Sequence, residues 1–118
     1  MSSRGVTPYR FQRGEDITVP ITDTEAAEAD LGTIVGRMKA LEPGARTLAA
    51  DATAIAFDVY YRAASDDLAK GWTFNIPAAR AITDAPTGYY LFNFAVVIDG
   101  VEVFKSDLVT ILIEESAA

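Results

Sequence analysis

The sequence predicts an all-β chain: one antiparallel β-sandwich of about seven strands, with at most one short helix, spanning residues 1–118. Two observations carry this prediction. Short runs of alternating apolar and polar residues recur, with turn residues between them at intervals of about 8 to 12 residues. Near the end, Asp99-Gly100 separates two runs of β-branched and aromatic residues, which is the strongest short-range signal of a β-hairpin. After this turn the chain runs back through Val101–Phe104 and on to Leu108. A balance of 50% apolar and 23% charged residues fits a single globular core.

The first strands are expected on either side of a turn. Alternation over Tyr9–Gln12 and again over Ile17–Ile21 predicts an opening strand pair, or one kinked strand. Pro20 cannot donate a hydrogen bond to a neighbouring strand, so its strand is expected at a sheet edge or a bulge. Thr33–Ala40 predicts a further strand, although its two basic residues would suit a helix as well.

The stretch Thr22–Leu31 is the best helix candidate in the chain. Thr22 or Thr24 is suited to capping it, and acidic residues fall in the first turn, where the helix dipole favours negative charge. A polar loop containing one helical turn fits the same residues equally well.

Three strands of the second half are predicted from their composition and period. Ile55–Tyr61 and Trp72–Ile76 place apolar side chains at every second position, so those side chains are expected to face the core. Pro77 ends the second of these strands. Residues 78–87 are expected to cross over to the long strand Gly88–Ile98.

The strand Gly88–Ile98 and the returning strand Leu108–Ile113 are apolar on both faces. A sandwich strand normally has one polar face, so another part of the chain, another subunit or a neighbouring protein should cover the second face. The interface hypothesis places six residues against a partner: Leu91, Ala95, Val97, Val109, Ile111 and Ile113. A register error of one residue would exchange these residues for their neighbours on the other face.

Aromatic residues supply two further predictions. Tyr90 lies two residues after Gly88, where a β-sandwich places a corner tyrosine whose hydroxyl reaches back to the backbone. A different class of function, binding of a carbohydrate or another ligand, would use exposed rings for stacking. The candidates for that role are Tyr60, Tyr89 and Trp72.

The chain lacks the residues on which several classes of function usually depend. The chain has no cysteine and no histidine, which removes disulfides, thiolate metal sites and the commonest general base. It has no nucleophile elbow and no phosphate-binding loop, so we expect no enzyme activity, no catalytic residue and no cofactor. A net charge of −7 argues against nucleic-acid binding. No apolar run reaches the ~20 residues of a membrane-spanning helix, so no membrane partner is expected.

Acidic residues are the remaining candidates for chemistry. Asp66-Asp67 and Glu114-Glu115 are not spaced as a calcium loop, and we interpret them as solvated charge, so no metal site is predicted. Asp58 lies within a strand and is expected to pair across the sheet with a Lys or Arg rather than act as a catalytic acid. Residues 1–8 and 114–118 are expected to be flexible tails.

The second half of the chain resembles a known family. The run Trp72-Thr73-Phe74-Asn75-Ile76-Pro77 is followed by Gly88-Tyr89-Tyr90 and the Asp99-Gly100 turn. This series is similar to the immunoglobulin-like β-sandwich domains of tailed-phage structural proteins, such as the N-terminal domain of phage baseplate upper proteins. Gly88 and Tyr90 match the Gly-x-Tyr element of that group, whereas Asn93 stands where an aspartate is more usual. The similarity covers residues 55–113.

The resemblance implies an immunoglobulin-like sandwich with a non-enzymatic, structural role. The chain would be a virion component of a tailed phage or prophage, at the head–tail connection, tail, baseplate or capsid, assembled in the host cytoplasm. Proteins of this group dock into symmetric assemblies. Other virion proteins and further copies of the chain are therefore the expected partners.

Overall fold

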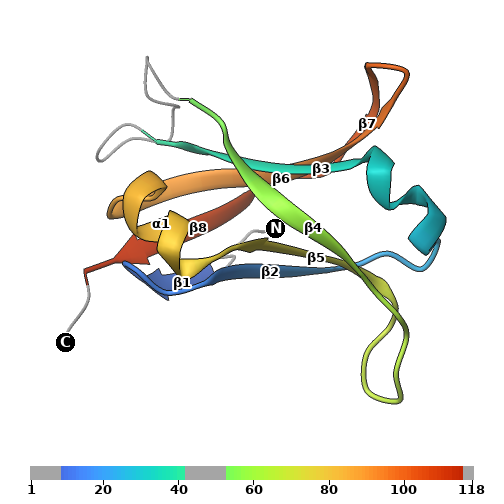
Figure 1. Cartoon of the computed structure of the whole chain (residues 1–118), viewed down its shortest axis with the longest axis horizontal. Helices are drawn as coiled ribbons and strands as arrows, with labels where there is room; N and C mark the ends of the chain where they lie inside the picture. Colours follow the sequence, from blue (N-terminus) through green and yellow to red (C-terminus); the bar gives the residue numbers. More distant parts are fainter. Residues whose placement is uncertain (1–8, 42–52, 116–118) are drawn as a thin grey trace, which may run out of the picture.

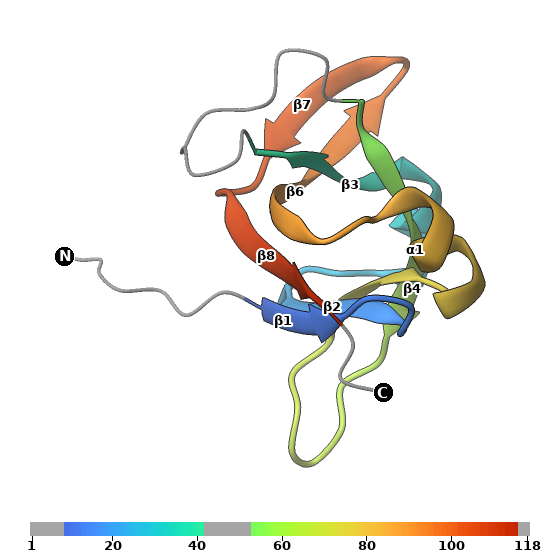
Figure 2. The same cartoon turned by 90° about the vertical axis from the view of Figure 1, so that its left-hand side faces the viewer.

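The computed structural model describes residues 9–41 and 53–115 of the chain. Its strands form one strongly bent sheet in the order β1-β8-β6-β3-β4-β5-β2, with β7 added beside β6, and this sheet is nearly closed like a barrel (Figures 1 and 2). Among the described strands, β1 and β8 are the one parallel pair, and the other pairs are antiparallel. The mostly β architecture expected from the sequence is confirmed, with eight strands in place of about seven.

The elements have the following bounds. The strands are β1 (Tyr9–Gln12), β2 (Ile17–Thr22), β3 (Ile34–Ala40), β4 (Ile55–Arg62), β5 (Gly71–Ile76), β6 (Gly88–Ile98), β7 (Val101–Lys105) and β8 (Val109–Glu114). The helices are the 3-10 helix η1 (Glu28–Thr33) and α1 (Ala78–Asp84). The described part of the chain thus contains two short helices, which corrects the expectation of at most one.

The segment Thr22–Leu31 is a loop that leads into one short 3-10 helix. Thr22 pairs with Gly71 as the last residue of β2, so it does not cap a helix. Asp23 then accepts hydrogen bonds from the backbone N–H of Glu25 at 3.0 Å and from the indole N–H of Trp72 at 3.1 Å. The first bond is local to the loop, and the second ties the loop to the core. Of the two alternatives for this segment, the polar loop with a helical turn is confirmed.

Helix α1 lies in the crossover of residues 78–87, for which the sequence predicts no helix or strand. Pro77 precedes it and alanine dominates its first turn, and both favour a helix. The Asp16 carboxylate accepts a hydrogen bond from the Ala78 N–H at 2.7 Å and so caps the helix from the β1–β2 turn. Because this cap comes from 62 residues away, the local sequence does not reveal it.

Strand β4 changes partner halfway along its length. Residues 55–57 pair with β3, whereas residues 58–62 pair with β5. The strand therefore joins the β1-β8-β6-β3 side of the sheet to the β5-β2 side. Pro20 lies on β2, which within residues 9–41 and 53–115 pairs with β5 alone, so the predicted edge position is confirmed for this part of the chain.

The core fills the inside of this bent sheet. Trp72, Phe74 and Ile76 of β5 are buried as predicted. The Phe74 ring contacts the Phe92 ring of β6 edge-to-face, with centroids 5.2 Å apart. Gly36 of β3 leaves room for Phe74, because a Cβ at that position would lie 2.3 Å from the ring. This close approach explains a glycine in the middle of a buried strand.

Tyr90 forms the predicted corner at the start of β6. Its side chain is buried, and its hydroxyl donates a hydrogen bond to the backbone carbonyl of Pro86, four residues upstream. Burial raises the pKa of the Tyr90 hydroxyl to about 12. The hydrogen bond fixes the crossover after α1 to the first half of β6.

Candidate protein-docking surface

The hairpin of β6 and β7 extends beyond the rest of the sheet. One edge of β6 pairs with β3; the other edge pairs first with β8, over Gly88–Phe92, and then with β7, over Ala95–Ile98. Figure 1 shows β7 rising away from the body of the molecule at one end. Asp99 and Gly100 both have positive φ, 52° and 80°, so the predicted two-residue hairpin turn is confirmed.

Apolar side chains are exposed along this hairpin. Four of them form what we call the hairpin patch: Ile98, Val101, Val103 and Phe104, which are 50%, 60%, 58% and 51% exposed. The register sets Val101 opposite Ile98 and Phe104 opposite Val96, which places them on the face of β6 that also carries Phe94. The Phe104 and Phe94 ring centroids are 5.8 Å apart. The hairpin patch therefore continues the apolar surface of the core out into solvent.

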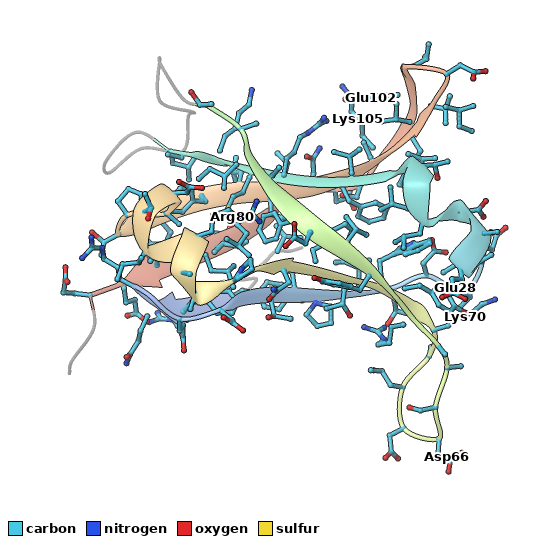
Figure 3. The ribbon with its side chains drawn as sticks, viewed as in Figure 1. Glu28, Asp66, Lys70, Arg80, Glu102 and Lys105 are labelled. Carbon is cyan, nitrogen blue, oxygen red and sulfur yellow. The ribbon has the colours of Figure 1, made fainter. Side chains whose placement is uncertain are left out.

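The opposite face of β7 is charged. Glu102 and Lys105 lie next to each other there, 3.5 Å apart (Figure 3). Arg37 of β3 donates two hydrogen bonds to the Glu102 carboxylate, at 2.6 and 3.1 Å, and a third to Asn93 at 3.2 Å. The hydrogen bonds from Arg37 lower the pKa of Glu102 to about 2, and the same pair raises the pKa of Arg37. One face of the hairpin is thus tied to β3 by the ion pair between Arg37 and Glu102, while the other face is apolar and exposed.

A groove of about 330 Å³ lies on the outer face of β3 and β6. Its lining residues are Arg37, Met38, Lys39, Ala54, Leu91, Asn93 and Leu108. Leu108, in the connection from β7 to β8, is 63% exposed. The groove combines basic and apolar side chains, and it includes Leu91 of the interface hypothesis.

The six residues of the interface hypothesis fall into two groups. Three are partly exposed, namely Leu91, Val97 and Val109. The other three are buried within the chain, namely Ala95, Ile111 and Ile113, at 0%, 0% and 2% exposure. Ile111 and Ile113 belong to the core, whereas Ala95 is buried on the other face of β6, where Val35 and Lys105 are its neighbours in the sheet. Buried side chains are not available to a partner. The structure therefore removes these three residues from the hypothesis.

The register between β6 and β8 explains why Ile111 and Ile113 point into the core while Leu91 does not. Tyr90 lies opposite Ile111 and Leu91 lies opposite Thr110, so each even residue of β6 is paired with an odd residue of β8. Opposite residues share a face of the sheet. Since Tyr90 faces the core, Ile111 faces it as well, whereas Leu91 faces outward. The odd residues of the two strands therefore point to different sides.

The residues of the ligand-stacking alternative do not form a common surface. Trp72 is only 1% exposed, and its indole N–H is bonded to Asp23. Tyr60 and Tyr89 are 52% and 50% exposed. The register across β6, β3 and β4 places these two tyrosines about eight residue rows apart, which at about 3.3 Å per row is roughly 25 Å. One small ligand would not reach both rings.

Two of the acidic candidates, Asp58 and Glu114, form ion pairs with arginines. Asp58 lies 3.7 Å from the guanidinium of Arg80, so its basic partner belongs to α1 rather than to a neighbouring strand. Glu114 ends β8 and pairs with Arg10 at 3.1 Å, which corrects the expectation of a flexible tail from residue 114 onward. Residues 1–8 and 116–118 lie outside the described residues.

Asp66 lies at the end of the β4–β5 loop, away from the body of the molecule (Figure 3). Asp67 beside it and Glu115 after β8 are exposed as well. Within residues 9–41 and 53–115, no group of three or more acidic side chains is placed to hold a metal ion.

Sequence reasoning missed the hairpin patch. It treats Val101–Phe104 as part of a returning strand and assigns it no surface role. One signal was present: Ser106-Asp107 divides the returning apolar residues into two short runs. Two such runs indicate that one stretch of β6 is paired by a separate strand.

Comparison with known proteins leaves the geometry as the basis of the functional argument. No protein-family model, curated protein or solved structure matches the chain. In the part of the chain that the structure describes, no helix is long and apolar enough to cross a membrane.

Proposed function

We propose that this chain is a non-enzymatic structural protein that docks against copies of itself and against other proteins in the virion of a tailed phage. The hairpin patch carries the proposal, because its four apolar side chains are each at least half exposed and lie on one short hairpin. Contiguous exposed apolar surface on a folded chain usually marks an interaction site. The charged residues on the other face of β7 supply orientation to such a contact.

The proposal includes an immunoglobulin-like arrangement of the strands. The hydrogen bond from Tyr90 to the Pro86 carbonyl supports it, because a corner tyrosine of this kind is typical of that fold. The change of partner along β4 supports it too, since it divides the other strands into two groups that face each other across the core. The phage setting is supported by the sequence resemblance over residues 55–113.

The test is the molar mass of the full chain in solution, measured by size-exclusion chromatography with light scattering over a concentration series. We expect the mass to rise above the 12.7 kDa of one chain. The double variant V101S/V103S removes exposed apolar surface from the patch and is expected to remain monomeric at concentrations where the wild type associates. The matched control is L68S, which removes a leucine of 46% exposure from the β4–β5 loop and should associate as the wild type does. A wild type that stays monomeric throughout contradicts the proposal.

A further inference from the structure

The outer edge of β7 is unpaired within residues 9–41 and 53–115. In a two-residue hairpin the pair beside the turn, here Ile98 and Val101, exchanges hydrogen bonds, so the N–H and C=O of the next residue, Glu102, point away from β6. At the other end of β7, the N–H of Ser106 donates to the Phe94 carbonyl at 2.9 Å. The backbone groups of the preceding residue, Lys105, therefore also point outward.

A bulge explains why Glu102 and Lys105, three positions apart, face the same edge. Val96 lies opposite Phe104 and Val97 lies opposite Glu102, so Val103 is an extra residue in β7. Without the bulge, outward-facing groups would recur at every second residue. The edge that β7 offers to another strand thus has two bonding positions, Glu102 and Lys105.

We propose that this edge pairs antiparallel with β7 of a second copy of the chain about a two-fold axis, with Glu102 of each copy opposite Lys105 of the other. The inference rests on the proposed docking function and names its partner and register. A two-fold contact uses the same surface on both copies, so the surface must be complementary to itself.

Charge selects this register. Three two-fold registers bring the outward-facing backbone groups opposite one another: Glu102 with Glu102, Lys105 with Lys105, and Glu102 with Lys105. The first two set like charges directly opposite each other, which destabilises a strand pair. Only the third pairs opposite charges, and the two-fold axis makes that pair twice.

The same register places the apolar residues at the centre of the contact. Val103 of one copy lies opposite Phe104 of the other, so the hairpin patches of the two copies meet on the face opposite the ion pairs. Phe104 already contacts Phe94, and the joined patches would extend both cores toward each other. One strand pair is at the low end of interface sizes, so the dimer is weak and depends on concentration.

Charge reversal tests the register. K105E sets carboxylates opposite one another and E102K sets ammonium groups opposite one another, so each variant alone is expected to raise the dissociation constant of the dimer by about tenfold or more. An equal mixture of the two variants restores opposite charges at both positions and should associate at least as well as the wild type. Sedimentation at protein concentrations up to about 1 mM detects a dimer whose dissociation constant is as high as the millimolar range.

Two further measurements separate pairing from a loss of hairpin structure. E102K removes the ionic partner of Arg37 and could loosen the hairpin for that reason alone. The double variant R37E/E102K restores this ion pair with reversed signs, and it takes the place of E102K in the mixture if E102K loosens the hairpin. Hydrogen exchange in the wild type should show protection of the Glu102 and Lys105 amides that increases with protein concentration.

Failure of this inference and failure of the docking function give different results. If the wild type associates but the charge variants do so equally, and these two amides exchange alike at all concentrations, the β7 pairing is overturned and docking uses another surface. If the wild type stays monomeric throughout, both proposals are overturned. Association that is lost in each single variant and restored in the mixture supports both.

Discussion

Strands β7 and β8 pair with the same edge of β6, one after the other, yet they lie in opposite environments. In β8, Ile111 and Ile113 point into the core and β1 covers the outer edge. In β7 every residue is exposed, and within the described residues its outer edge is unpaired. Both strands are rich in β-branched residues. What lies opposite a strand, rather than its own residues, therefore decides whether it becomes core or surface.

The largest expected difference between the two strands is the effect of a buried charge. I111D places a carboxylate in the core, without a partner, and should lower the free energy of unfolding by at least ~4 kcal/mol, which is enough to unfold a marginal domain. V103D makes the same chemical change at an exposed position and should alter it by about 0.5 kcal/mol or less. Urea unfolding, followed by Trp72 fluorescence at a concentration where the chain is monomeric, measures both. Similar losses in the two variants would contradict the contrast between β7 and β8.

The second effect concerns Tyr90, which fixes β6 where it pairs with β8. Y90F removes the hydrogen bond to Pro86 and should cost about 1 kcal/mol. The folded-state pKa of about 12 lies above the ordinary value of 10.0, so the contribution of this group to stability is complete below pH 10 and is lost as the pH rises toward 12.

We therefore expect the wild type to lose stability across that alkaline range and Y90F to lose less. The control is Y60F, which changes an exposed tyrosine and should keep the full alkaline decline. Urea midpoints measured on either side of pH 10 give the comparison. A decline in Y90F as steep as in the wild type would show that Tyr90 is not the titrating group.

The smallest effect concerns the ion pair that ties β7 to β3. The pKa of Glu102 is about 2 in the folded chain against an ordinary 4.5, so its contribution is present above pH 4.5 and is lost as the pH falls toward 2. The pair is partly exposed, so its effect on global stability is small and the suitable observable is local. The protection of the β7 amides in the monomer, measured as their exchange rate relative to an unstructured peptide at the same pH, should decrease across this acidic range.

E102Q should show the faster exchange of β7 already at neutral pH, and little further change on acidification beyond the intrinsic pH dependence of exchange. E115Q changes an exposed carboxylate after β8 and should behave as the wild type. If E102Q leaves the exchange of β7 unchanged at neutral pH, the ion pair does not hold the hairpin.

Predictions from the sequence succeeded where structure is decided by near neighbours. Period-two alternation placed Trp72, Phe74 and Ile76 inward, and the turn after Ile98 follows from the backbone freedom of Asp99-Gly100. The cap of α1 by Asp16 could not be predicted in this way, because it depends on a contact between distant segments.

The candidate site shows the same limit more sharply. The sequence shows that β6 and β8 are apolar on both faces, but it does not show which face of each strand lies in the core. That depends on the register between the two strands. That register sends Ile111 inward and Leu91 outward. The exposure of Val103 and Phe104 depends on which strands extend far enough to cover them, and alternation within one strand contains no such information.

The bulge at Val103 also bears on solubility. An open strand edge can pair with a strand of any other chain and so promotes aggregation. A regular edge would offer bonding positions at every second residue to any regular strand. Because the bonding positions of β7 are three residues apart, a regular strand can satisfy only one of them at a time. A strand with the same bulge can satisfy both positions, and the outer edges of both β7 strands are then paired. The extra residue would thus favour pairing with a second copy of the chain and end association through β7 at two copies.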